Sequence, residues 1–203
     1  LKIRNVVNIL NTDVLIAFLD IPSFIAQIIS FPFFNKKTIV SERVLEIGNP
    51  SKIRIINRIL YRFVNYVTAN SNANRELIEN SSPWVKNKIK VIYNSVDLDK
   101  FTVNNSRLIN NNRIIVVASF RNTKNPLGLI RAVKRVTELQ PDLDFVIEWF
   151  GHKNPDYGDD TSTVYIESER AIQSLKLEKF FKLRDAVTDI DKEYKNSSAL
   201  ILP

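Results

Sequence analysis

Short apolar runs alternate with helix-like segments along nearly the whole chain, and this alternation limits the fold more than any other feature of the sequence. The runs are almost continuously apolar, as in "DVLIAFL" at 13–19 and "RIIVVAS" at 113–119. Strands buried on both faces have this composition, and strands that alternate with helices form parallel sheets covered by helices. The sequence therefore predicts an α/β fold built from parallel sheets.

The apolar runs and the helical spacing between them place the expected elements. We expect strands at 13–19, 37–42, 67–71, 88–94, 113–119, 143–150, 179–183 and 198–202. We expect helices after Pro22 and at 51–66, 71–80, 125–139, 167–177 and 189–196. Ser51 and Ser71 precede two of these helices, and serine is a favoured N-cap because its side chain accepts a hydrogen bond from a free N–H group.

The segment "VNNSRLINNNR" at 103–113 is polar and rich in asparagine, and it has little to bury. Such segments mark domain boundaries. A chain of 203 residues can form two small domains. We therefore expect a first domain at 1–102, a linker at 103–112 and a second domain at 113–203.

Composition excludes several classes of site. The chain has no cysteine and one histidine, His152, so disulfides, thiolate zinc sites and histidine-rich metal sites are excluded, and a Ser/His/Asp triad is disfavoured. A lone histidine in a polar loop is more often structural than functional. The net charge of +7 favours an anionic partner, although solubility alone would also account for it. The aromatic residues lie mostly in apolar runs, which argues against nucleic-acid binding.

The location of the protein follows from its apolar segments. The longest of them, at 13–34, is interrupted by polar residues and prolines, and a membrane span needs about 20 consecutive apolar residues. It also lacks the charged start and cleavage site of a signal peptide. We expect a cytoplasmic protein. Because the chain contains no methionine and starts with leucine, we also expect it to be part of a longer protein.

The stretch "ASFRNTKNP" at 118–126 connects a strand to a helix and carries two cations, Arg121 and Lys124, without any glycine. Asn122, Thr123 or Asn125 could cap the helix, and proline next to them suits its first turn. Arginine and lysine beside a helix N-terminus are suited to binding a diphosphate. A solvated turn with two surface cations is the alternative.

Two further patterns have both a functional and a structural interpretation. Asp-x-Asp triplets begin at Asp97, Asp142 and Asp189; paired carboxylates can bind a divalent metal, but turns and helix starts also favour acids. Arg54, Arg58 and Arg62 follow each other at four-residue spacing, beside an apolar face formed by Ile55, Ile56, Ile59, Leu60 and Phe63. This basic stripe would suit an anionic membrane surface, or it is a solvated helix face.

Six segments, in this order and at this spacing, resemble the family 4 retaining glycosyltransferases, which have the GT-B fold. They span nearly the whole chain and are "TDVLIAFLD" (12–20), "TIVSER" (38–43), "VTANSNANRELI" (67–78), "IKVIYNSVDLDKF" (89–101), "VVASFRNTKNPLGLIRAV" (116–133) and "YKNSSALILP" (194–203). The resemblance implies two Rossmann-like lobes, both incomplete here. The family's N-terminal glycine-rich loop and C-terminal paired-glutamate motif have no counterpart in the chain.

The resemblance also implies a donor diphosphate site at the start of the second lobe. Lys124 matches the family's phosphate lysine, whereas Ala118-Ser119 stands where the family has Gly-Arg. Arg121, two residues after Ser119, is the expected substitute for that arginine. Weaker candidates lie elsewhere: Asn94 and Asp97 at the interdomain crossing, Glu42 and Arg43 on the acceptor side, and Leu183, Arg184 and Asp185 around the nucleobase.

The implied function is transfer of a sugar from a nucleotide diphosphate sugar to a polysaccharide or lipid-linked acceptor, with retention, on the cytoplasmic face of a membrane. The resemblance implies neither a metal nor a cofactor, because cationic side chains and helix N-termini neutralise the leaving diphosphate. Because part of the donor site has no counterpart, we expect the chain alone to be nearly inactive. The alternative is a non-catalytic, two-lobed module that binds an anionic ligand or a membrane surface.

Overall fold

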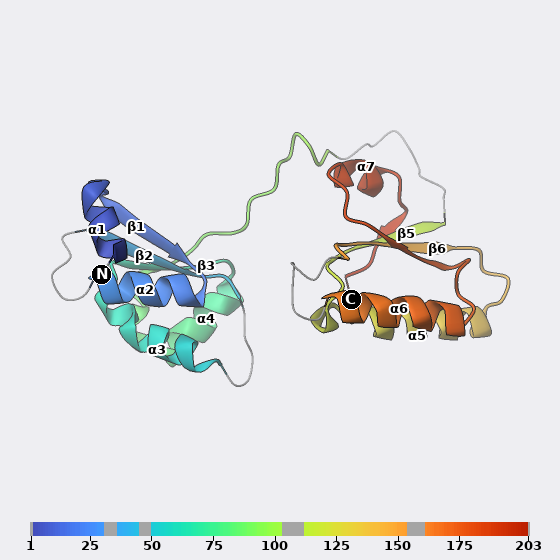
Figure 1. Cartoon of the computed structure of the whole chain (residues 1–203), viewed down its shortest axis with the longest axis horizontal. Helices are drawn as coiled ribbons and strands as arrows, with labels where there is room; N and C mark the ends of the chain where they lie inside the picture. Colours follow the sequence, from blue (N-terminus) through green and yellow to red (C-terminus); the bar gives the residue numbers. More distant parts are fainter. Residues whose placement is uncertain (1, 31–35, 45–49, 103–111, 154–160, 203) are drawn as a thin grey trace. The chain divides into compact units, whose positions relative to one another are not determined.

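The computed structural model describes residues 2–30, 36–44, 50–102, 112–153 and 161–202. The chain forms two compact units, Leu1–Val96 and Asp97–Pro203 (Figure 1). Each unit contains one four-stranded sheet, and every strand pair in both sheets is parallel. The predicted α/β fold with two parallel sheets is confirmed.

The first sheet has its strands in chain order, β1-β2-β3-β4. The strands are β1 (Val14–Phe18), β2 (Lys37–Glu42), β3 (Tyr66–Ala69) and β4 (Ile89–Val91). The helices of this unit are α1 (Lys2–Ile9), α2 (Asp20–Ser30), α3 (Lys52–Leu60) and α4 (Asn72–Ser81), with short 3-10 helices η1 (Tyr61–Phe63) and η2 (Pro83–Val85). Right-handed crossovers in one direction put α2, α3 and α4 on the same face of the sheet, as Figure 1 shows.

The two predicted serine caps are present in this unit. The Ser51 side chain accepts a hydrogen bond from Arg54 N at the start of α3, and the Ser71 side chain accepts one from Asn74 N at the start of α4. Each bond satisfies an N–H group that the first turn of a helix leaves without a partner. The starts of both helices were therefore predictable from local sequence alone.

The second sheet has the strand order β7-β6-β5-β8, so the chain reverses direction across the sheet after β7. Its strands are β5 (Arg113–Val117), β6 (Val146–Phe150), β7 (Phe181–Arg184) and β8 (Ala199–Leu200). Its helices are α5 (Pro126–Leu139), α6 (Thr161–Ser174) and α7 (Ile190–Lys195), and the 3-10 helix η3 (Asn122–Lys124) precedes α5. Because the direction reverses, α5 and α6 cover one face and α7 lies on the other (Figure 1).

Each unit has its own hydrophobic core. The core of the first unit includes Val40, Tyr61, Val67 and Ile78, and all four side chains are buried. The core of the second unit is made by side chains from the sheet, the loop after β5, α5 and α6, among them Val116, Phe120, Ile130, Trp149 and Phe181. Two cores fit a chain in which two sheets each have to bury their own apolar faces.

The structure differs from the predicted elements in several places. Helix α2 begins at Asp20 rather than after Pro22, and α3 ends at Leu60 rather than at 66. Helix α1 at Lys2–Ile9 was not expected, and α6 starts at Thr161 rather than at 167, where we expected it to start. Val164, Ser168 and Ile172 are buried at four-residue spacing along α6, so its packed stripe includes a serine that obscures the apolar pattern. The helix ends at Ser174 rather than at 177, and Lys176 has a left-handed φ of 55°.

The predicted linker, 103–112, lies outside the described residues except for Asn112. The structure groups residues 97–102 with the second unit, whereas the sequence placed them in the first domain. Contacts with α7 and the loop before it hold them there. Phe101 packs edge-on against Tyr194, and the Lys100 ammonium donates to the Thr188 carbonyl. Within the described ranges, none of the helices is long and apolar enough to cross a membrane.

Candidate functional site

The carboxyl ends of β5, β6 and β7 lie along one edge of the second sheet, because these strands are parallel and in register. Val117 pairs with Phe150, and Phe150 pairs with Arg184. We call the residues that follow these ends, 118–125, 151–153 and 184–185, the second-sheet edge. It is rich in charge, with Arg121, Lys124, Lys153, Arg184 and Asp185, and it also includes His152. Ligands of open parallel sheets bind at such an edge.

The loop after β5 leads directly into helix α5. Residues 122–124 form the 3-10 turn η3, in which Lys124 N donates to the Arg121 carbonyl at 2.9 Å. Asn125 follows with a left-handed φ of 51°, and its side chain accepts a hydrogen bond from Gly128 N at 3.2 Å. Of the three expected cap candidates, Asn122, Thr123 and Asn125, it is Asn125 that caps the helix, and the predicted proline in the first turn is confirmed. Asparagine suits this position because it tolerates the left-handed conformation and caps the helix as well.

Both cations of this loop reach solvent. Arg121 and Lys124 are exposed, and Lys124 is the last residue of η3, two residues before Pro126 opens α5. Ser119 is half-buried, and its carbonyl accepts a hydrogen bond from Arg121 N at 2.9 Å. The loop thus places two cations close to the positive end of the dipole of α5, which favours an anion there.

A glycine does lie at the second-sheet edge, but it follows β6 rather than β5. A Cβ atom on Gly151 would lie 2.1 Å from the Ala118 carbonyl oxygen, which is inside any allowed contact. The same carbonyl accepts a hydrogen bond from Trp149 Nε1 at 2.8 Å, so it cannot easily move. Close backbone approach between the β5 and β6 loops therefore requires glycine at 151.

Arg184 at the end of β7 is held by a carboxylate from the neighbouring strand. Its Nε lies 2.9 Å from Glu148 Oε1, and Arg113 Nε lies 2.5 Å from Glu148 Oε2. Burial alone would raise the pKa of Glu148, but the hydrogen bonds from Arg184 and Arg113 outweigh it and lower this pKa. The predicted base-side residue Leu183 packs against the core of the unit, while Arg184 remains about half exposed.

Sequence reasoning missed Lys153 at this edge. Its Nζ lies 3.2 Å from Asp185 Oδ2 and 5.1 Å from the centroid of the Tyr165 ring. Burial opposes the charge of Lys153, but the hydrogen bonds and charges of Asp185 and Tyr165 together outweigh it and raise the pKa of Lys153. Lys153 follows β6 by three residues, so its position after a strand end was the signal that could have found it. The exposed His152 precedes it.

In the first unit, the ends of β2 and β4 meet through Arg43 and Asn94. The Arg43 guanidinium donates to Asn94 Oδ1 and lies 5.7 Å from the centroid of the Phe18 ring. Asn70, which follows β3, donates to the Arg43 carbonyl at 2.9 Å. The structure therefore brings together Arg43, predicted on the acceptor side, and Asn94, predicted at the interdomain crossing, at the carboxyl edge of the first sheet.

The other crossing residue, Asp97, is the first residue of the second unit. Its Oδ1 accepts hydrogen bonds from the backbone N of Asp99 at 3.0 Å and of Lys100 at 3.1 Å. This is the turn chemistry expected of an aspartate after a strand. In the part of the chain that the structure describes, no three acidic or histidine side chains are grouped as metal ligands.

Glu42, a predicted acceptor-side residue, is packed inside the first unit. Its side chain is buried, and its carboxylate accepts hydrogen bonds from Arg58 Nη2 at 2.6 Å and from the Tyr61 hydroxyl at 2.9 Å. Burial, and then the charge of Glu42, raise the pKa of Tyr61, so the phenol stays protonated as a donor. Glu42 therefore stabilises the first unit.

Solved structures show the same arrangement of elements over nearly the whole chain. A glycosyltransferase from Rickettsia africae ESF-5 has a TM-score of 0.74 at 18% identity, covering 99% of this chain and 54% of its own. HepE from Anabaena, solved with UDP-glucose, has a TM-score of 0.74 at 19% identity, covering 98% and 54%. A TarM variant from S. aureus, solved with UDP, has a TM-score of 0.72 at 16% identity, covering 97% and 38%.

The fold is GT-B-like. Its two Rossmann-like lobes are the two units described above. The chain spans 54% of the length of the first two of these structures and 38% of the third. No protein-family model matches the chain, and no curated protein matches it either. At these identities the likeness establishes the fold, while the chemistry has to be argued from side chains.

The predicted basic stripe on α3 is not a surface feature. Arg54 and Arg58 are buried, and each is paired with a carboxylate: Arg54 Nη2 lies 2.8 Å from Asp20 Oδ2, and Arg58 pairs with Glu42. Of the three arginines, only Arg62 is exposed. Two acids from α2 and β2, distant in sequence, turn the helix so that its arginines face inward.

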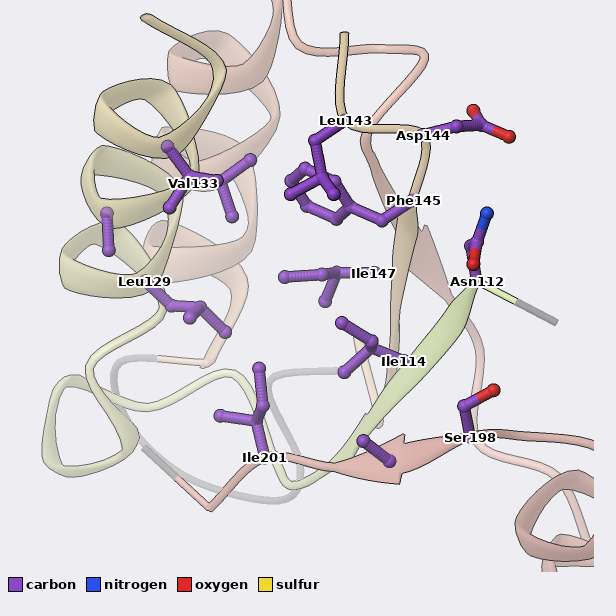
Figure 2. A pocket seen from close by; sticks show the side chains of 13 residues that line it. Asn112, Ile114, Leu129, Val133, Leu143, Asp144, Phe145, Ile147, Ser198 and Ile201 are labelled. Carbon is purple, nitrogen blue, oxygen red and sulfur yellow. The ribbon is translucent and has the colours of Figure 1, made fainter. Parts of the chain in front are cut away.

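A pocket of the second unit lies away from the second-sheet edge. It has a volume of about 440 Å³ and is formed by α5 and the strands β5, β6 and β8. Figure 2 shows Leu129, Val133, Phe145, Ile147 and Ile201 lining it. The only polar side chains among its lining residues are those of Asn112, Asp144 and Ser198. It contains no cation, so its chemistry does not suit a phosphate, and none of the predicted site residues lines it.

Proposed function

We propose that this chain is part of a glycosyltransferase and that the second-sheet edge binds the diphosphate of a nucleotide diphosphate sugar. The observation that carries the proposal is the placement of Arg121 and Lys124 at the mouth of α5, on the carboxyl edge of the second lobe of a GT-B-like fold. The fold alone does not choose a reaction. It is the combination of this fold with exposed cations at the ligand-binding edge that favours sugar transfer.

The chemistry of the edge fits a leaving diphosphate. During transfer, negative charge develops on the diphosphate, and preorganised donors stabilise it when they are already aimed at its position. Lys124 supplies a point charge and Arg121 a planar fork with several N–H donors, and the positive end of the α5 dipole lies beside them. Ser119 lies between the strand and these cations, where a ligand at the edge would pass close to it.

The nucleobase would lie beside Leu183, Arg184 and Asp185. Glu148 holds Arg184, and Lys153 holds Asp185, so both polar side chains of this region are fixed by partners. Side chains held in place before a ligand binds lose less conformational freedom on binding. HepE was solved with UDP-glucose and the TarM variant with UDP, which supports a uridine diphosphate sugar as the donor.

The first unit would carry the acceptor. Arg43 and Asn94 lie together at the carboxyl edge of its sheet, and Asn94 and Asp97 stand at the passage from one unit to the next. We propose a polysaccharide or lipid-linked sugar as the acceptor and retention of the anomeric configuration. A transfer assay with the whole protein and UDP-glucose, followed by NMR of the anomeric proton, tests both: an inverted product contradicts retention.

Calorimetric titration of the chain with UDP tests the donor site. Lys124→Ala is expected to weaken UDP binding by about 1–3 kcal/mol, the scale of a lost charge-assisted hydrogen bond. Lys134→Ala on the same helix is the matched control, because Lys134 pairs with Glu138 farther along the helix and should leave the affinity unchanged. Equal affinity of the Lys124→Ala protein and the unaltered chain for UDP would show that the diphosphate binds elsewhere.

A further inference from the structure

The second unit begins with a short segment that lies on α7. We call this segment, residues 97–102, the strap. The Phe101 ring packs edge-on against the Tyr194 ring, with the two centroids 5.9 Å apart. The Lys100 ammonium lies 3.8 Å from Asp191 Oδ1, and the Lys100 side chain is 42% exposed. Exposed ion pairs of this kind contribute little to stability, so the strap can leave α7 at low cost.

Helix α7 is held on the second unit mainly by polar partners. None of its six residues, 190–195, is buried. Its anchor on the sheet side is Arg113, whose guanidinium donates to the Glu193 carboxylate and whose Nη1 lies 3.4 Å from the Asn196 carbonyl oxygen. The carbonyl groups at the end of a helix need such donors. Elements with few buried apolar contacts open locally at low free energy, so α7 can move together with the strap.

Arg113 also reaches the second-sheet edge, through Glu148. Arg113 Nε lies 2.5 Å from Glu148 Oε2, and Arg184 Nε lies 2.9 Å from Glu148 Oε1. The carboxylate is buried between the two guanidinium groups, and a buried carboxylate needs such partners. The Arg184 carbonyl in turn accepts a hydrogen bond from Gly151 N at 3.2 Å, between the ends of β6 and β7. A continuous series of contacts therefore runs from the strap through α7 to the second-sheet edge.

Glu193 decides how the Arg113 guanidinium is shared. In the structure, this guanidinium donates to Glu148 and to Glu193 at the same time. Without Glu193, it could turn two parallel N–H groups toward Glu148, which is the bidentate geometry that arginine and carboxylate prefer. It would then compete with Arg184 for Glu148 Oε1. The position of α7 thus selects between two arrangements of one ion network, of which one holds Arg184 and the other releases it.

We propose that Arg113 and Glu148 are positioning residues that link docking of the strap on α7 to the base side of the donor site. This rests on the proposed function, because it takes the ligand beside Arg184 to be a nucleotide. A nucleotide that needs Arg184 in the observed position favours the docked strap, and the docked strap favours the nucleotide by the same factor. Since the strap follows Val96, the last residue of the first unit, nucleotide binding holds the chain more firmly where it leaves that unit.

Hydrogen exchange of the chain without nucleotide tests the link on its own. The double variant Lys100→Ala/Phe101→Ala removes the contacts of the strap. It is expected to speed exchange about fivefold in α7 and at the Gly151 amide, because local opening sets these rates. An unchanged rate at Gly151 would overturn the proposal, whatever happens in α7.

The matched control is the double variant Leu139→Ala/Lys179→Ala. Leu139 is an exposed apolar residue of the same unit. Lys179 resembles Lys100, because each ammonium lies near the ring of the next residue, a phenylalanine, and 3.8 Å from an aspartate oxygen. The control should change the exchange rates in α7 and at Gly151 less than about twofold.

Calorimetric titration with UDP tests the coupling to the nucleotide. Lys100→Ala/Phe101→Ala is expected to weaken UDP binding about fivefold, although neither side chain belongs to the second-sheet edge. In a Glu148→Gln background, where the link is already broken, the same double variant should weaken binding less than about 1.5-fold. A network that only stabilises the fold would not give this difference. In the unaltered chain, saturating UDP should slow exchange of the Phe101 amide, which donates to the Asp97 carbonyl, about fivefold.

The outcomes separate this proposal from the proposed function. If the unaltered chain does not bind UDP, the donor site is contradicted, and the exchange experiment still decides the link. If UDP binds, three results overturn the proposal: unchanged affinity of the double variant, equal losses with and without Glu148→Gln, or an unchanged exchange rate of the Phe101 amide. Circular dichroism melting checks that each variant is folded. If the double variant unfolds, Lys100→Ala alone replaces it, because that side chain is 42% exposed.

Discussion

Arg58 and Glu42 form a buried ion pair that joins α3 to the end of β2. Arg58 Nη2 lies 2.6 Å from Glu42 Oε1, Arg58 Nε lies 3.4 Å from Glu42 Oε2, and both side chains are buried. The Tyr61 hydroxyl donates to the same carboxylate. The sequence placed Glu42 on the acceptor side and Arg58 on a basic surface stripe. In the structure the two are partners inside the first unit.

Removing one partner of this pair is expected to destabilise the first unit by about 3–5 kcal/mol, because the remaining charge stays buried without compensation. Arg58→Ala and Glu42→Ala should both show this in urea unfolding followed by circular dichroism. Hydrogen exchange should rise in α3 and β2 and stay unchanged in the second unit. Arg62→Ala is the control, since Arg62 is exposed and its loss should cost less than about 0.5 kcal/mol. Losses of similar size in both arginine variants would contradict the assigned role.

Glu148 should make the free energy of unfolding of the second unit depend on pH in the acidic range. Its folded pKa is lowered, so its contribution is fully present above its unfolded pKa of about 4.3 and is lost as the pH falls through the folded value. Glu148→Gln is therefore expected to cost about 1.5–3 kcal/mol at neutral pH and much less at pH values below the folded pKa. Urea midpoints measured across this range give the difference. Glu138→Gln, on an exposed pair of α5, should show no such convergence.

Gly151→Ala should destabilise the second unit by about 1–3 kcal/mol, the usual cost of forcing an added methyl group into packed surroundings. The new Cβ would meet the Ala118 carbonyl, which Trp149 Nε1 already holds. Unfolding followed by the fluorescence of Trp149, in a Trp84→Phe background, reports on this unit directly. An unchanged midpoint would mean that the two loops approach each other less closely than the structure shows.

Asn125 is expected to tolerate glycine but not alanine. It combines a left-handed φ of 51° with a capping hydrogen bond to Gly128 N. Asn125→Ala loses the cap and strains the backbone, for about 1–2 kcal/mol, whereas Asn125→Gly should cost only a few tenths because glycine keeps the conformation. Thermal melting of the two variants distinguishes them. If both variants have the same melting temperature, the left-handed backbone at Asn125 contributes nothing to the difference in stability between alanine and glycine.

Local sequence was sufficient for much of the fold. The alternation of apolar runs with helical segments predicted two parallel sheets, the caps at Ser51 and Ser71 lie where their side-chain chemistry placed them, and Asn125 is one of the three candidates expected to cap α5. The cations Arg121 and Lys124 were predicted at a strand end, and parallel strands put all such ends on one edge. These features depend on neighbours within a few residues or on the direction of strands, and both can be read along the chain.

Tertiary structure alone decided which side of α3 is buried and which side chains meet. The spacing of Arg54, Arg58 and the isoleucines shows that α3 has two different faces, but not which face has partners. Asp20 and Glu42 turn the arginines inward, and strand pairing brings Asp185 to Lys153 and Asn94 to Arg43. A buried charge is stable only beside its opposite, and that opposite comes from an element distant in sequence, so the sequence determined the two faces and the packing chose between them.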